Sequence, residues 1–338
     1  MNVTLSPRHP VTPSPCQPTM SRYILRRLLI AIPTLIGVTI LIFLAMRVLP
    51  GDPLAVVVSE SAGRQVLSEA ELASLRASLG LDRPYYVQYL QWMGEVVSGE
   101  LGSSFWTKEP IRDLILRRGP ITAEIALFAV LFSWLVGVPI GMLSAMWRNS
   151  RFDYFLRMGI TVFIAVPSFW LGLLTVLFTV LVLSWRPPLS IVQLWDDPLT
   201  NLSMTLLPAL AVGLGLAAGQ ARMSRSAALE VLYEDYIRTA RAKGLNEKLV
   251  MWRHVFKNAM LPVVTTSGLA MGGLLGGAVS VERAFGVPGL GALLVQALND
   301  RDWMMIQNLV LIYGLIFVAI NLLVDLSYAW FDPRIRYE

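Results

Sequence analysis

Residues 230–262 read EVLYEDYIRTARAKGLNEKLVMWRHVFKNAMLP and form a strongly charged interval between two long apolar segments. The sequence predicts a first helix that begins near Glu230 and stops at Gly244, because glycine is favoured just past a helix end. A second helix is predicted over residues 246–259, and Pro262 is expected to open the next apolar segment. Two short helices joined at a glycine should therefore project from a membrane surface.

The composition of the whole chain is that of a membrane protein. Of its 338 residues, 55% are hydrophobic and only 15% are charged, and the mean hydropathy is +0.59. An apolar run of about 20 residues is long enough to cross the hydrocarbon core of a bilayer. The sequence predicts an all-α polytopic fold with six transmembrane helices, at residues 28–46, 122–146, 158–183, 204–222, 263–281 and 308–330.

The distribution of Lys and Arg predicts the orientation of these spans. Both residues are denser in the segments before the first span, between spans two and three, between spans four and five, and after the last span. The positive-inside rule places such segments in the cytoplasm. Both termini are therefore expected to be cytoplasmic. The net charge of +5 is no sign of nucleic-acid binding, because the basic residues sit in short loops between spans.

The chain divides into four predicted regions. Pro, Ser and Thr dominate the N-terminal end, which is typical of disorder. The regions are a disordered Pro-rich tail over residues 1–20, a first transmembrane helix over 21–47, an external helical cap over 48–121, and a five-helix core over 122–338 that includes the 230–262 loop.

The external cap is predicted to contain three helices. Ser68 and Glu71 form a capping box at the start of the first helix, and a second helix begins at Tyr85. Pro110 suits the first turn of a third, short helix that ends near Arg118. These helices are expected to cover the external mouth of the bundle.

The sequence argues against an enzyme. It contains no phosphate-binding loop of the form G-x-x-x-x-G-K-[ST], no H-E-x-x-H and no G-x-S-x-G. Cys16 is its one cysteine, so neither an intrachain disulfide nor a cysteine-based zinc site is expected. Its two histidines, His9 and His254, lie outside the predicted spans and cannot activate a nucleophile there. No catalytic residue, metal site or directly bound cofactor is predicted.

The 230–262 stretch resembles the coupling loop of the membrane subunits (permeases) of ATP-binding-cassette importers. YIRTARAKGL and RHVFKNAMLP are similar to the branch that imports dipeptides, oligopeptides, glutathione and nickel, and to the B-type permease of the dipeptide and oligopeptide systems. Arg238 stands where the broader loop consensus has Glu, which is usual for the peptide branch. Ala240 falls where that consensus has its second Ala.

Other motifs extend the resemblance from about Met20 to Tyr337. In chain order they are LPGDP at 49–53, GELGS at 99–103, NLLVD at 321–325 and DPRIR at 332–336. Residues 282–291 are also similar to an external re-entrant region of such permeases.

The resemblance implies a bacterial inner-membrane subunit that forms the translocation pathway for di- or oligopeptides, with glutathione or nickel as alternatives. It implies three kinds of protein partner besides membrane lipid: a second related permease in a heterodimer, two ATPase subunits, and an extracytoplasmic substrate-binding protein. ATP and Mg²⁺ would be used by the ATPase subunits alone.

In this family the helix around residues 235–244 is expected to dock in a cleft of the ATPase. The alternative is an ordinary exposed helix in a basic loop. Lys243 is expected to pair with acidic residues of the ATPase, and Gly244 to set the bend. The predicted coupling residues are Asp235, Tyr236, Arg238, Thr239, Ala240, Ala242, Lys243 and Gly244.

A glycine row marks the fifth span. Gly268, Gly272 and Gly276 repeat every four residues, a spacing that lets helices approach closely. They can serve static helix packing, the favoured interpretation, or a gate at which two subunits slide.

A second functional class, an ion-coupled secondary transporter, needs carboxylates near the bilayer midplane and internal inverted repeats. Asp325 is the one candidate carboxylate, and an interhelical hydrogen bond explains it more simply.

Overall fold

The computed structural model describes residues 20–48, 73, 77, 82–188 and 190–331, and over these residues the chain is helical. An isolated bridge between Ser103 and Pro110 is the one pairing of extended backbone in this part of the chain. The all-α prediction is confirmed. Several predicted features lie outside the described residues: the tail over 1–19, the LPGDP turn, the capping box at Ser68 and Glu71, and the C-terminal DPRIR motif.

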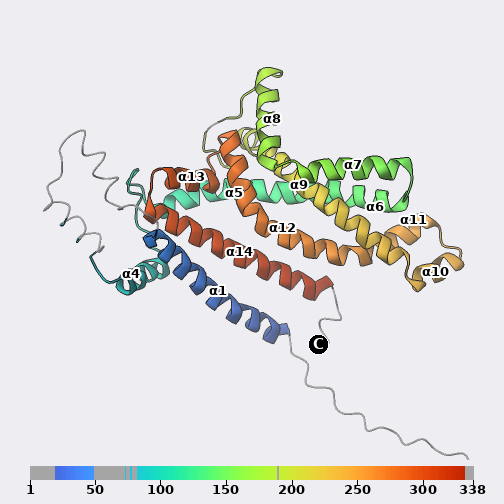
Figure 1. Ribbon diagram of the computed structural model, residues 1–338, viewed down its shortest axis with the longest axis horizontal. Helices are drawn as coiled ribbons and strands as arrows, with labels where there is room; N and C mark the ends of the chain where they lie inside the picture. The colour runs from blue at the N-terminus through green and yellow to red at the C-terminus, as the bar shows by residue number, and fades with distance from the viewer. Residues whose placement is uncertain (1–19, 49–72, 74–76, 78–81, 189, 332–338) are drawn as a thin grey trace, which may run out of the picture.

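The helices follow one another in the order α1 (Met20–Val48), α4 (Tyr85–Ser98), α5 (Ile111–Phe132), η1 (Ser133–Gly137), α6 (Val138–Met146), α7 (Arg151–Ala165), α8 (Ser168–Leu181), α9 (Pro198–Leu232), α10 (Asp235–Ala242), α11 (Glu247–Leu249), η2 (Val250–Val255), α12 (Phe256–Phe285), α13 (Leu290–Asn299) and α14 (Trp303–Phe331). The two η elements are π-helical turns inside longer helices. Figure 1 shows α10 and α11 at one end of an elongated bundle, with α4 and α13 at the other. We call these the α10 end and the α13 end.

Four helical segments of the described chain are long and apolar enough to cross a membrane. They cover residues 27–48, 111–146, 198–232 and 303–324. Two further pairs of helices, each bent at a short break, are long and apolar enough only when the two helices of a pair are counted as one span. These pairs are α7 with α8, bent by 96°, and the last part of α12 with α13, bent by 83°. The described chain thus has four to six spans, and the predicted six is the upper limit.

The predicted span over 158–183 is divided at Pro167 into parts of α7 and α8. The residue before a proline avoids the α-helical region of backbone space. Val166 is accordingly extended, with φ −83° and ψ 124°, and α8 begins after Pro167. α8 therefore projects steeply away from α7 (Figure 1).

Two other prolines do not end helices as the sequence suggested. The predicted short helix from Pro110 to Arg118 is the beginning of α5, which continues through Pro120. The predicted boundary at Pro262 lies inside α12. Each proline costs one backbone hydrogen bond, but the residue after it, Ile121 or Val263, is fully buried among neighbouring helices. Packing on other helices offsets the lost bond.

α9 is the central helix of the bundle and contacts α5, α6, α7, α8 and α12 (Figure 1). Its approach to η1 and α6 is close enough to bring backbones together. A Cβ atom at Gly137 would overlap the Ala217 carbonyl oxygen, and one at Gly141 would overlap that of Ala221. Glycine is therefore required where η1 and α6 approach α9.

α4 confirms the predicted helix that begins at Tyr85. Trp92 of α4 is buried, and its indole N–H donates to Asn308 Oδ1 of α14 at 3.3 Å. Arg47 at the end of α1 donates to Gln88 Oε1 at 2.8 Å. α4 is thus attached to both α1 and α14 at the α13 end.

Candidate functional site

The predicted coupling helix is a separate element, α10, and does not continue the preceding helix. The sequence suggested one helix from Glu230 to Gly244, but α9 runs on to Leu232 and ends there. Glu234 is extended, with φ −66° and ψ 144°, and α10 begins after it at Asp235. The bend at residues 233–234 turns α10 away from the axis of α9 at this end of the bundle (Figure 1).

Gly244 ends α10, as predicted. Its φ of +79° is left-handed and suits glycine. The Gly244 amide donates to the Arg241 carbonyl at 2.9 Å, and the Leu245 amide donates to the Ala240 carbonyl at 3.4 Å. This pair of bonds is the Schellman motif. It satisfies two carbonyl groups that the helix end would otherwise leave unpaired.

The inner face of α10 packs on the transmembrane bundle. Ile237 is fully buried and Ala240 is 6% exposed. Both belong to a hydrophobic cluster that joins α6, α9, α10, η2 and α12, with buried members Val138, Met142, Ala145, Ala227, Ala228, Val250, Met251, Val255, Ala259 and Val263. The structure therefore places Ala240, a predicted ATPase contact, against this chain's own core. A bulky or charged residue there would disturb the fold of the loop itself.

The outer face of α10 is exposed. Its exposed residues include the other predicted coupling side chains, namely Asp235, Tyr236, Arg238, Thr239, Ala242 and Lys243. Arg238 Nη1 lies 3.3 Å from Asp235 Oδ1, one turn away, and both side chains are largely exposed. The structure thus brings these predicted residues together on one surface, which is basic and has a small residue at Ala242.

A hydrogen bond and an ion pair attach α10 to the segment that follows it. Asn258 Nδ2 of α12 donates to the Tyr236 hydroxyl at 2.9 Å. Arg241 pairs with Glu247 of α11 at 2.5 Å, and the hydrogen bond with that carboxylate raises the pKa of Arg241 above its ordinary value. Because α11, η2 and α12 are contiguous, these two contacts connect α10 to α12.

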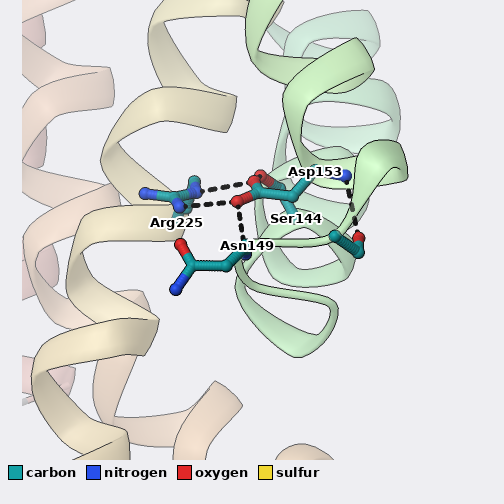
Figure 2. Close-up of polar contacts among 5 residues, drawn as sticks. Ser144, Asn149, Asp153 and Arg225 are labelled. Carbon is teal, nitrogen blue, oxygen red and sulfur yellow. Dashed lines mark hydrogen bonds and ion pairs between the residues drawn. The ribbon is translucent and has the colours of Figure 1, made fainter.

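A buried ion pair close to α10 was not found from the sequence. Asp153 of α7 is fully buried and accepts hydrogen bonds from Arg225 of α9 at 2.9 and 3.1 Å, from Ser144 Oγ of α6 at 2.5 Å and from the Asn149 amide at 3.0 Å (Figure 2). The Asp153 amide in turn donates to Ser150 Oγ, the N-cap of α7, at 3.1 Å. This network joins three helices at the base of the loop.

Part of that network has a sequence signal. Ser150 and Asp153 have the S-x-x-[DE] spacing of a helix N-terminus. Nothing local identifies Arg225 as the partner, since it lies 72 positions further along the chain.

The predicted re-entrant region at 282–291 is a sharp turn built around a buried carboxylate. Glu282 is fully buried at the end of α12. It accepts from Thr122 Oγ1 at 2.7 Å and from the Ala292 amide at 3.0 Å, and a Cβ at Gly289 or Gly291 would collide with it. The carboxylate therefore fixes the 83° bend between α12 and α13.

The glycine row of α12 is described only in part. A Cβ at Gly268 would overlap the Val324 side chain of α14, so Gly268 serves helix packing within this chain. Gly272 and Gly276 lie within α12, but their surroundings are outside the described part, as is the side chain of Asp325. The gate remains a prediction. Among the described residues no group of three or more His, Cys, Asp or Glu is placed to bind a metal ion.

Two family models match the chain and together cover most of it. Residues 137–337 match the model described as "Binding-protein-dependent transport system inner membrane component". Residues 20–126 match the model of the N-terminal part of the membrane component of such systems. The first match alone covers more than half of the chain and includes α10.

Curated relatives agree with these matches over their entire length. A putative peptide transport system permease protein of Brucella abortus (strain 2308) is 41% identical, covering 94% of this chain and 100% of the relative. The dipeptide transport system permease protein DppB of Alkalihalophilus pseudofirmus is 38% identical, with the same coverage. The glutathione transport system permease protein GsiC of Salmonella typhimurium is 40% identical, again over 94% and 100%.

A solved structure shares the fold at low sequence identity. An inward-facing conformation of the MetNI methionine ABC transporter contains a chain that superposes with a TM-score of 0.55 at 17% identity, covering 66% of this chain and 99% of that one. The helical bundle is thus the ABC permease fold. The chain belongs to the family of binding-protein-dependent transport system inner membrane components, as an ABC importer permease subunit of the DppB type.

Proposed function

We propose that this chain, together with a second related permease, forms the translocation pathway through which an ATP-driven importer moves di- or oligopeptides across the inner membrane. The relatives described above support the substrate class, since two of the three are named for peptide or dipeptide transport. In the proposed heterodimer each permease contacts one ATPase subunit.

The coupling mechanism is supported by one observation above all. α10 has an exposed outer face, while its inner face packs on the bundle and two polar contacts attach it to α11 and α12. We propose that Arg238, Thr239, Ala242 and Lys243 contact the ATPase cleft, with Lys243 facing acidic residues. The ATPase subunits use ATP and Mg²⁺. Closure of those subunits pushes α10, and α12 moves with it, so that the pathway opens alternately to the two sides.

The proposed orientation follows the distribution of Lys and Arg. The α10 end faces the cytoplasm together with both termini, in agreement with the positive-inside rule. The α13 end then faces outward, where a substrate-binding protein delivers its ligand. Its contact surface would include α4 and the turn at residues 286–289.

Glutathione is the main alternative substrate, because relatives of equal similarity are named for it. Nickel stays open from the resemblance of the loop alone. No comparison favours the ion-coupled transporter.

Uptake into proteoliposomes tests the proposal. The chain is reconstituted with the permease, ATPase and binding proteins encoded beside it, and entry of a labelled dipeptide is measured with glutathione and Ni²⁺ as competitors. We expect uptake that requires both ATP and the binding protein and that unlabelled dipeptide suppresses. Suppression by glutathione or Ni²⁺ instead would reassign the substrate. Uptake driven by a proton or sodium gradient without ATP would refute the mechanism.

A further inference from the structure

One face of α9 is unsuited to lipid. Gly215, Gly219, Arg222 and Ser226 follow one another at intervals of four, three and four residues, which puts them on one side of the helix. None of the four is buried, and Arg222 and Ser226 are exposed. A lipid-facing surface of a transmembrane helix is apolar, so this face is expected to meet water or protein.

This face lines a hollow of about 340 Å³ between α9 and α12. By the rise of an α-helix, Gly215 and Ser226 lie roughly 16 Å apart along its axis. The wall of the hollow is polar where the two helices meet. Thr266 Oγ1 lies 3.4 Å from Gln220 Oε1, and Gln220 Nε2 donates to Ser267 Oγ.

Arg222 is the one charged residue in the lining of this hollow. Within the described part of the chain it has neither a hydrogen bond nor an ion pair, whereas Arg225, less than one turn away, pairs with Asp153. Arg222 stands at the end of the predicted span over 204–222, and its guanidinium is available to bind an anion that enters the hollow.

We propose that this hollow is a wall of the translocation pathway and that Arg222 contacts the C-terminal carboxylate of the peptide as it passes. The inference rests on the proposed function. A guanidinium matches a carboxylate with two parallel hydrogen bonds, and every linear peptide with a free C-terminus has that group. Gly215 and Gly219 leave room for peptide side chains of different size. A single exposed arginine binds weakly, which lets the substrate leave.

Thiol chemistry tests whether the hollow is an aqueous, anion-attracting site. In a Cys16→Ser background, Ser226→Cys places a thiol one turn from Arg222. Leu41→Cys, on the exposed apolar face of α1 that we expect to meet lipid, is the control. The assembled complex is treated with anionic and cationic methanethiosulfonate reagents. A unit charge roughly 6 Å away in water should favour the anionic over the cationic reagent by about tenfold, relative to a free thiol.

We expect this preference at Ser226→Cys, its loss when Arg222→Gln is added, and no reaction at Leu41→Cys. An unreactive Ser226→Cys would mean that the second permease or lipid covers this face, and would overturn the inference. A preference that persists after Arg222→Gln would also overturn it.

A transport assay distinguishes a contact between Arg222 and the peptide from a contact between Arg222 and the phosphate of a lipid headgroup. Arg222→Gln should lower the ATP-dependent uptake of a dipeptide by about tenfold, as expected for loss of a charged hydrogen-bonded pair. Arg222→Lys should restore part of it, and Arg151→Gln, at another exposed arginine, should import like wild type. Complex assembly and basal ATPase rate should not change. Uptake unchanged by Arg222→Gln refutes the inference alone, whereas a wild-type complex that imports no peptide refutes the proposed function.

Discussion

Replacing Asp153 with alanine removes the carboxylate at the centre of the network that joins α6, α7 and α9. Four hydrogen bonds end on this carboxylate, two of them from Arg225. Asp153 is fully buried, and the Arg225 side chain is 18% exposed. Asp153→Ala therefore leaves a largely buried cation, a hydroxyl and a backbone amide without their acceptor.

The expected loss is large for a single residue. Breaking a buried ion pair by removing one partner costs about 3–5 kcal/mol of unfolding free energy, because the remaining charge is left uncompensated. Asp235→Ala is the matched control. It makes the same chemical change in a pair whose side chains are 94% and 70% exposed, where the expected cost is below about 1 kcal/mol.

Reversible unfolding of the chain in mixed detergent micelles, followed by tryptophan fluorescence, measures both losses. The cycle is completed with Arg225→Ala and the double variant. The double variant should cost less than the sum of the two single variants, by about 1–3 kcal/mol, because it leaves no unpaired charge. If Asp153→Ala costs no more than Asp235→Ala, or if the two losses simply add, the network does not stabilise the base of the coupling loop.

Three further changes test other parts of the fold. Gly141→Ala should lower the unfolding free energy by about 2 kcal/mol or more, because the added methyl overlaps the Ala221 carbonyl oxygen where α6 meets α9. Gly244→Ala should cost about 1 kcal/mol through its left-handed φ, whereas Gly94→Ala, helical with open space around it, should cost nothing. Equal effects of Gly244→Ala and Gly94→Ala in the same unfolding assay would contradict this. Hydrogen bonds from the first turn of α9 hold the pKa of Asp197 below its ordinary value of 3.8. Its stabilising contribution should therefore be present above that value and fade as the pH falls through the lowered folded-state pKa. A pH titration of the unfolding midpoint should show this loss for wild type and not for Asp197→Asn.

The prolines show where sequence reasoning about the fold succeeds and fails. Local rules predict a possible break at every proline, yet α1, α5, α9 and α12 continue through Pro33, Pro120, Pro208 and Pro262. Only at Pro167 does the chain bend sharply within a predicted span. At Pro120, Pro208 and Pro262 the next residue is buried against other helices, and that tertiary packing is not visible in a local window. Pro33 has exposed neighbours, and α1 continues through it without such packing.

The sequence predicted where the candidate site lies in the chain, but not which side of its helix packs on the bundle. The end of α10 at Gly244 follows from helix-capping rules, whereas the break between α9 and α10 at residues 233–234 was not predicted. Which side of an eight-residue helix meets the bundle depends on α6, α9 and η2, so Ala240 could not be placed on the inner face in advance. Arg225 likewise becomes the partner of Asp153 only when α7 packs on α9.

Co-purification with the ATPase tests most directly the central claim that α10 couples this chain to that subunit. Ala242→Glu adds a carboxylate to the exposed basic face of α10 without entering the core, and Ser98→Glu adds the same side chain at the exposed end of α4 as the control. We predict that the ATPase co-purifies with wild type and with Ser98→Glu, and that Ala242→Glu loses it while keeping the second permease. Full retention of the ATPase by Ala242→Glu, or its absence from the wild-type preparation, would contradict the claim.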